Sequence, residues 1–264
     1  MKFIGRLPPL SDRAQIVAGI CFGVLVGIAL LAFVRSHPAQ LQTPWYSFVN
    51  PASMRQQANS PGFADFGGEN ASPDARYVAD WIADSHDAAG SAFVIVDKRE
   101  AKVYVFNADA RLRGASPVLL GVTPGDDTTP GIGSRPIPEV LPEERTTPAG
   151  RFVGERGHDA RGEDVVWVDY DAAVSMHRVL TTNPAERRLE RLATPTSDDN
   201  RISYGCINVP VAFYEDYIQP MFANRRAIVY VLPEFKSLEQ VFGAYDVAAV
   251  HGLVRAQPQA DAGM

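Results

Sequence analysis

The residues best suited to covalent chemistry lie around Cys206. A cysteine attacks through its thiolate, and an unperturbed thiol with a pKa of about 8.5 is only a few per cent ionised at neutral pH. Gly205 permits backbone angles that a Cβ forbids, and Asn208 shortly before Pro210 favours a helix cap and a helix start. We therefore expect Cys206 at an exposed strand-to-helix corner, where its amide and those of Tyr204 and Gly205 converge as oxyanion donors. The alternative is that this cysteine is a small buried hydrophobic residue.

Such a thiol needs a base, and the best-placed candidate is His177. The other histidines after residue 75 are His86, His158 and His251, and only His177 lies in an apolar stretch that predicts a strand. A strand would hold the imidazole rigidly beside the cysteine. On the pattern alone, a histidine that simply satisfies its hydrogen bonds within a sheet is the alternative.

The segments that must position these residues are mainly strands. β-branched and aromatic residues predict a hairpin over 91–107 and further strands over 116–122, from 147, over 164–170, 173–180 and 227–232. Six prolines in 123–148 predict a long loop, which either lines a substrate groove or is a decorative insertion. Helical spacing predicts helices over 74–87, 184–192, 211–220 and 238–250. The helix that begins at 211 is expected to bury Val211, Tyr214, Tyr217, Ile218, Met221 and Phe222.

Composition and charge restrict the partners. The net charge of −6 and the pI near 5.4 argue against nucleic acid, because phosphate binding needs clustered excess Lys and Arg. With 264 residues the chain is long enough for one sizeable domain and its appendages.

The first residues predict a membrane anchor. No charged residue occurs from 14 to 34, and at about 1.5 Å per residue this run can cross a hydrocarbon layer of about 30 Å. Lys2, Arg6 and Arg13 precede it, so residues 1–13 are expected to stay in the cytoplasm while the remainder is exported. An uncleaved anchor is favoured over a cleaved signal peptide, because the run is long and no small-x-small site precedes Arg35.

Export makes the cysteine count informative. Cys21 falls in the membrane run, so Cys206 has no disulfide partner in the exported part. A lone exported thiol is a liability unless it is buried, paired with another chain or used in chemistry.

The predicted organisation after the anchor has four parts. They are a Pro- and Gly-punctuated linker over 35–73, a helical lead-in over 74–90, a catalytic domain over 91–233 and a C-terminal extension over 234–264.

Together these features resemble the L,D-transpeptidase catalytic domain of the YkuD type. That family combines a strand histidine, about fifteen residues, and then Ser/Thr-His-Gly-Cys-hydrophobic-Asn/Arg. The present chain has His177 followed by Ser203-Tyr204-Gly205-Cys206-Ile207-Asn208. The family also tends to open with a hairpin and to carry a Thr-Pro-x-Gly-x-Phe turn, which matches residues 147–152.

The resemblance implies a mostly β, sandwich- or barrel-like domain with a few short helices. It also implies that the cysteine attacks a peptidoglycan stem tetrapeptide at the L-to-D bond before its terminal D-alanine and passes the acyl group to an amine. Neither a metal nor another cofactor is implied. The site residues expected on this basis are Cys206 as nucleophile, His177 as general base, Tyr204, Gly205 and Ser203 as oxyanion and supporting groups, and Arg201 and Asn208 as substrate-binding groups.

Two departures from the family pattern bear on activity. Tyr204 replaces the usual second histidine, and the spacer after His177 is lengthened by residues 184–200. Arg178 stands where the family often has a small or polar residue that orients the imidazole, although its backbone carbonyl can still do so. The alternatives to transpeptidation are an L,D-carboxypeptidase or hydrolase on the same bond and a non-catalytic peptidoglycan-binding protein.

Overall fold

The computed structural model describes residues 62–223 and 225–253. The predicted cytoplasmic tail 1–13, the anchor 14–34 and most of the linker 35–73 lie outside the described residues. None of the helices within the described ranges has the length and apolar character needed to cross a bilayer.

The fold is built on one eight-stranded sheet. In spatial order its strands are β3 (Leu112–Pro117), β2 (Lys102–Phe106), β1 (Phe93–Asp97), β10 (Ala227–Val231), β5 (Gly150–His158), β6 (Asp164–Asp169), β7 (Val174–Arg178) and β9 (Ile207–Val209). Strands β4 (Leu120–Gly121) and β8 (Arg201–Ser203) form a separate parallel pair.

The two edges of the large sheet are joined by a short backbone bridge. Leu119, shortly after edge strand β3, donates to the Asn208 carbonyl at 2.9 Å, and Asn208 of edge strand β9 donates back at 2.8 Å. Because the segment that follows one edge pairs with the other edge, the sheet curls into a barrel-like form. The predicted mostly β architecture with few short helices is therefore confirmed.

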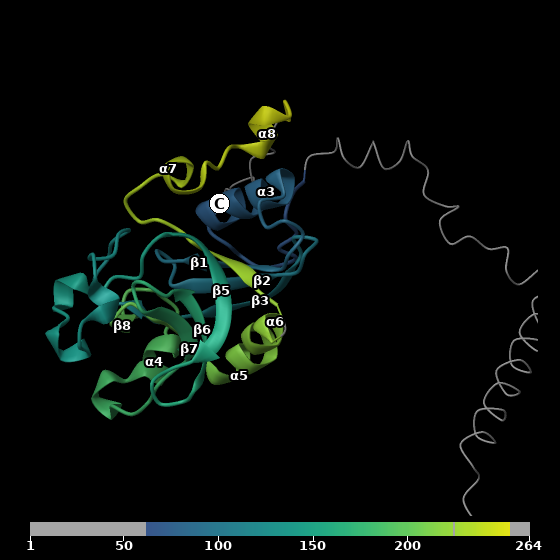
Figure 1. Cartoon of the computed structure of the whole chain (residues 1–264). Helices are drawn as coiled ribbons and strands as arrows, with labels where there is room; N and C mark the ends of the chain where they lie inside the picture. Colours follow the sequence, from purple (N-terminus) through teal and green to yellow (C-terminus); the bar gives the residue numbers. More distant parts are fainter. Residues whose placement is uncertain (1–61, 224, 254–264) are drawn as a thin grey trace, which may run out of the picture. The chain divides into compact units, whose positions relative to one another are not determined.

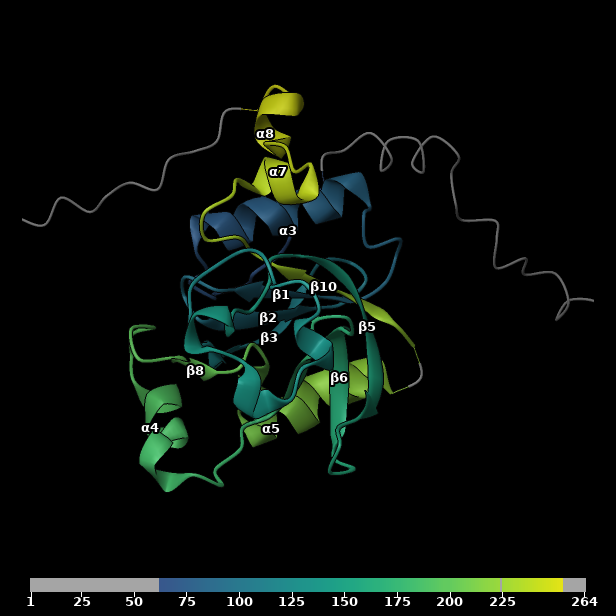
Figure 2. The ribbon, with the colours of Figure 1, turned by 60° about the vertical axis from the view of Figure 1, so that its left-hand side comes forward.

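Within the described residues the helices are short apart from α3. They are α3 (Pro73–Ser85), α4 (Arg188–Ala193), α5 (Val211–Phe213), α6 (Gln219–Phe222), α7 (Leu238–Phe242) and α8 (Val247–Val250), with a π-helical turn η6 (Tyr214–Ile218) between α5 and α6. Short 3-10 turns occur at η2 (Ile132–Ser134), η3 (Ile137–Glu139), η4 (Pro142–Glu144) and η5 (Pro184–Glu186). Helices α3, α7 and α8 lie on one side of the sheet, and α5 and α6 lie on the other (Figures 1 and 2).

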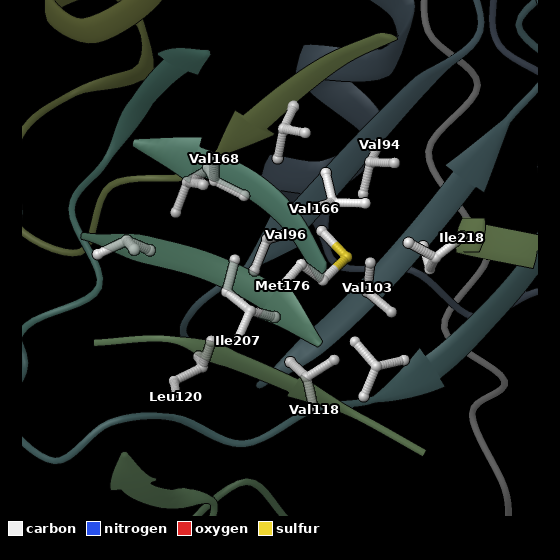
Figure 3. Packing of buried hydrophobic residues seen from close by; sticks show 14 of the residues in the cluster. Val94, Val96, Val103, Val118, Leu120, Val166, Val168, Met176, Ile207 and Ile218 are labelled. Atoms are coloured by element: carbon white, nitrogen blue, oxygen red, sulfur yellow. The ribbon is translucent and has the colours of Figure 1, made fainter. Parts of the chain in front are cut away.

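The central strands carry an apolar core on each face. Val94 and Val96 of β1 belong to the main core, where they pack with residues of other strands and with Ile218 of η6 (Figure 3). Phe93 and Ile95 alternate to the opposite face and pack in a second core with helix α3. Burial on both faces explains why the strand predicted at the start of the hairpin is an unbroken apolar run.

Two predicted helices differ from those observed. The helix that begins at Val211 continues past Pro220 to Phe222, because a π-helical turn precedes the proline and relieves the clash with the preceding turn that an α-helical proline creates. Val211 itself is exposed, whereas Tyr214, Ile218 and Phe222 are buried as predicted. The C-terminal helix is divided into α7 and α8 by Gly243, whose φ is +70°.

A buried lysine fixes the base of the 123–148 loop. Lys98 is 1% exposed, and its ammonium group donates to Asp126 Oδ1 and to the Thr147 carbonyl, each at 3.0 Å. Asp126 also accepts hydrogen bonds from three successive backbone amides at 234–236, at 2.6 to 2.8 Å. Burial alone would raise the pKa of Asp126, but these amides and Lys98 outweigh it and lower the pKa from 3.8 to about 2.

We expect replacement of Lys98 by Met to destabilise the protein by about 3–5 kcal/mol, because it leaves the buried Asp126 carboxylate without its charged partner. Equilibrium unfolding in urea measures this difference. The matched control is Lys236→Met, which removes an exposed lysine paired with Asp127 on the same loop and should change stability by only about 0–1 kcal/mol. Equal losses of stability in the two variants would contradict the role of the Lys98–Asp126 pair in fixing the base of the loop.

Candidate active site

Cys206 lies in a tight turn between two strands rather than at a strand-to-helix corner. Residues 204–206 connect β8 to β9, and the helix begins only at Val211, after Pro210. The expectation that Asn208 caps a helix was wrong, because Ile207–Val209 pair in parallel with β7 and are used as a strand. The cysteine is half-buried within this turn.

The pairing of β9 with β7 places the thiol beside a serine and a histidine. Met176 is opposite Ile207 in the parallel register, and Met176 is fully buried in the main core. Ser175 and His177 flank Met176 and therefore point to the other face of the strand, where Cys206 lies. The Ser175 hydroxyl is 3.6 Å from the Cys206 sulfur. The sheet itself thus assembles a Cys-His-Ser group.

The imidazole of His177 is oriented by the backbone. Its Nδ1 is 2.7 Å from the Arg178 carbonyl oxygen, and because a carbonyl only accepts, Nδ1 is the nitrogen that donates. Nε2 is therefore the acceptor in the neutral ring. This contact is the orienting role expected for the Arg178 carbonyl. The Cys206 sulfur lies 3.6 Å from the Ser175 hydroxyl and 3.7 Å from the Ala173 carbonyl oxygen. His177 acts on the thiol by lowering its pKa, which is the influence expected of a general base beside it.

The surroundings favour the thiolate of Cys206. Burial by itself would raise the pKa of the thiol, but the hydrogen bond and charge of His177, together with hydrogen bonds from Ser175, outweigh it. The pKa of Cys206 therefore lies below its ordinary value. A depressed thiol pKa beside a histidine is the arrangement that an activated nucleophile requires.

Ser203 shapes the reactive turn from within. Its hydroxyl donates to the Cys206 carbonyl at 2.6 Å and accepts from the Gly205 amide at 3.1 Å. This supports the turn, as expected for Ser203. It also means that the Gly205 amide is already occupied and does not serve as an oxyanion donor. The amides of Tyr204 and Cys206 are the candidates that remain from the predicted set.

Thr147 holds the same turn from the end of the long loop. Its hydroxyl donates to the Gly205 carbonyl at 2.8 Å and accepts from the Gly121 amide at 2.9 Å. Gly205 has a φ of +124°, and a Cβ there would lie 2.8 Å from the Thr146 carbonyl oxygen. Only glycine fits this position, because the loop backbone approaches it so closely.

Asn208 supports the turn and cannot reach a substrate. Its side chain is fully buried, and its Nδ2 donates to the Cys206 carbonyl at 3.2 Å. Its Oδ1 accepts from Arg188 Nη1 at 2.7 Å. These contacts give Asn208 a positioning role, since the buried amide joins the Cys206 carbonyl to Arg188.

Arg201 is likewise part of the framework. Its guanidinium donates to the Gly121 carbonyl at 3.2 Å and to the Lys98 carbonyl at 3.0 Å, and it pairs with Glu234. These contacts use the guanidinium to hold β8 against the loop base. They account for Arg201 without a substrate contact.

Tyr204 faces outward and contacts the long loop. It is 43% exposed, and the guanidinium carbon of Arg145 lies 3.8 Å from the centre of its ring. The tyrosine at the position of the second histidine in the L,D-transpeptidase pattern is therefore engaged with an arginine from residues 123–148.

Three residues that contact or support the site around Cys206 were not identified as site residues from the sequence: Ser175, Thr147 and Arg188. Strand alternation was a signal for Ser175, since it lies two residues before His177 and so shares its face. The conformity of Thr147 to the Thr-Pro-x-Gly-x-Phe pattern pointed to a turn and gave no sign of its contact with Gly205. Arg188 belongs to the extra segment, which gave no signal. Within the described residues, no group of three or more His, Cys, Asp or Glu side chains is arranged to hold a metal ion.

Comparisons with known proteins give weak structural similarities. No family model matches the chain, and no curated protein matches it. Among solved structures, the helical cell shape determining protein Pgp2 from Campylobacter jejuni is 15% identical with a TM-score of 0.39, covering 62% of this chain and 52% of that one. An L,D-transpeptidase from Stackebrandtia nassauensis is 16% identical with a TM-score of 0.32, covering 62% and 68%.

An L,D-transpeptidase from Mycobacterium smegmatis is 14% identical with a TM-score of 0.32, covering 54% of this chain and 58% of that one. The chain spans about half the length of several of the solved structures that it matches. Similarities at these scores establish neither fold nor function.

The effect of His177 on the pKa of the Cys206 thiol predicts a pH profile for alkylation of that thiol. In the wild-type chain, the rate at which iodoacetamide alkylates Cys206 should rise with an inflection below about 8.5, the ordinary thiol pKa. His177→Gln should move the inflection above that value, since burial then acts without the histidine that offsets it. Intact-protein mass over a pH series gives the rates. The exposed His158→Gln serves as the control, and a shared inflection in all three proteins would refute the pairing.

The contact between Thr147 and Gly205 can be tested separately. Thr147→Val keeps the shape but leaves the Gly121 amide and the Gly205 carbonyl without this partner, which should cost about 1–3 kcal/mol of stability. The same change should slow Cys206 alkylation, because the turn loses its tie to the loop. Thr147→Ser keeps the hydroxyl and should lose clearly less in both measurements. If Val and Ser behave alike, the hydroxyl does not hold the turn.

Proposed function

We propose that this protein is a cysteine-dependent acyltransferase of the L,D-transpeptidase type that acts on peptidoglycan stem peptides. The observation that carries the proposal is the group formed by Cys206, His177 and Ser175, in which a half-buried thiol has its pKa lowered by a backbone-oriented imidazole. The sequence resemblance around residues 203–208 supplies the substrate class.

The reaction follows from the residues in place. Cys206 Sγ attacks the carbonyl carbon of the L-to-D amide while His177 Nε2 takes the thiol proton. The oxyanion is received by the amides of Tyr204 and Cys206. His177 then returns the proton to the departing D-alanine nitrogen, which leaves a thioester on Cys206. An acceptor amine attacks this thioester, loses its proton to His177 and releases the thiolate.

The proposed setting is the outer face of the cytoplasmic membrane. The uncharged run 14–34, preceded by Lys2, Arg6 and Arg13, supports a single-pass anchor with the catalytic domain in the periplasm or extracytoplasmic space. A membrane-tethered enzyme at this location would act on the cell wall during its remodelling.

Acylation tests the proposal directly. Incubation of the full-length chain with a stem tetrapeptide should add the mass of the acyl tripeptide to Cys206 and release D-alanine. Cys206→Ser should add no mass, and His177→Gln should slow acylation by about 10²–10⁴, the usual contribution of general acid-base catalysis. An acceptor amine should then yield the cross-linked product. Turnover by water alone would identify a hydrolase, and an unlabelled wild-type chain that still binds the peptide would identify a non-catalytic binding protein.

A further inference from the structure

The long loop brings an arginine beside the reactive turn, and the mechanism above does not use it. Arg145 places its guanidinium carbon 3.8 Å from the centre of the Tyr204 ring, two residues before the nucleophile. The same stretch of loop is tied to the turn by the 2.8 Å hydrogen bond from Thr147 to the Gly205 carbonyl. The guanidinium is therefore held against residue 204 of the reactive turn by the loop as well as by the ring.

Arg145 differs from three other arginines near the turn because it is not paired with a carboxylate among the described residues. In the part of the chain that the structure describes, no carboxylate pairs with it, and its Nε and Nη2 groups donate only to the Val140 carbonyl, at 3.2 and 3.0 Å. Its Nη1 group makes no hydrogen bond within the same residues. Three other arginines near the site each pair with a carboxylate: Arg178 with Glu215, Arg188 with Glu186, and Arg201 with Glu234.

An immobilised guanidinium without a counter-charge is suited to a carboxylate ligand. The planar fork of N–H donors matches a carboxylate, and stacking on an aromatic face fixes the plane of the fork. The Tyr204 ring supplies that face. A lysine or a mobile arginine would offer the same charge without the fixed geometry.

The substrate class named above carries such a group at the required place. In a stem tetrapeptide attacked at its last amide, the leaving residue is a single D-alanine, and its free carboxylate lies two bonds beyond the scissile nitrogen. We propose that Arg145 binds this terminal carboxylate and that Tyr204 holds the guanidinium in position for it. This inference rests on the proposed function, because that function supplies the peptide. It gives Tyr204 a role in place of the histidine found in the family pattern.

Binding to an unreactive chain tests the site without the chemistry. The full-length Cys206→Ser variant is titrated with the stem tetrapeptide and with the same peptide as its C-terminal carboxamide. The free acid should bind about tenfold to hundredfold more tightly, as hydrogen bonds to a charged group allow. Adding Arg145→Gln should bring the two affinities together, and Tyr204→Ala should reduce the preference while Tyr204→Phe keeps it.

The control and the contrary outcomes separate this inference from the proposed function. Arg161→Gln removes an equal charge from an exposed arginine in the β5–β6 connection and should leave the acid preference unchanged. Equal affinities for acid and amide with Arg145 intact, a preference that survives Arg145→Gln, or no binding of either peptide would each overturn the site. Acylation of the wild-type chain is measured separately. An unlabelled wild-type chain together with an acid preference that depends on Arg145 would refute the acyl transfer and support the carboxylate site.

Discussion

The buried ammonium of Lys98 is the constraint from which the geometry around Cys206 follows. A charge that is removed from water needs close polar partners, because its desolvation is otherwise too costly. Lys98 finds them at both ends of the 123–148 loop, in Asp126 near its start and in the Thr147 carbonyl near its end. The loop must therefore close onto the end of β1. Once it does, the Thr147 hydroxyl meets the Gly205 carbonyl, so the electrostatic requirement of one lysine also fixes the turn that carries the nucleophile.

Strand alternation separates the chemistry from the core. On β7, Met176 fills the main core while Ser175 and His177 face the thiol, so one five-residue strand serves both purposes. The parallel partner β9 begins immediately after Cys206 and places the sulfur level with that face. Because these residues are held by sheet pairing, the thiol and the imidazole meet without a flexible linker. Positioning of this kind is what allows the histidine to outweigh the effect of burial on the thiol pKa.

The sequence predicted the elements better than the contacts between them. The hairpin over 91–107, a helix from 211 and the proline-rich loop all followed from local patterns, whereas the π-helical turn within that helix did not. Local patterns also singled out His177 and Cys206, but the parallel register that joins their strands is a long-range property. The same limit applies to the expectations for Arg201 and Asn208. Both are polar residues close to the nucleophile, and only the fold shows that their partners, Glu234 and Arg188, occupy them.

Two long connecting segments converge on one short turn. The 123–148 loop contacts this turn through Thr147 and Arg145. The extra segment after His177 contributes Arg188, which donates to Asn208 just after the turn. A lengthened spacer would be expected to loosen the geometry between base and nucleophile, since longer loops are usually more mobile. Here the spacer runs outside the sheet pairing that sets that geometry, and its arginine instead fixes the amide that holds the Cys206 carbonyl. The longer spacer after His177 is therefore compatible with His177 and Cys206 acting as base and nucleophile. The tyrosine at position 204 instead changes the neighbouring part of the turn, where it packs against Arg145.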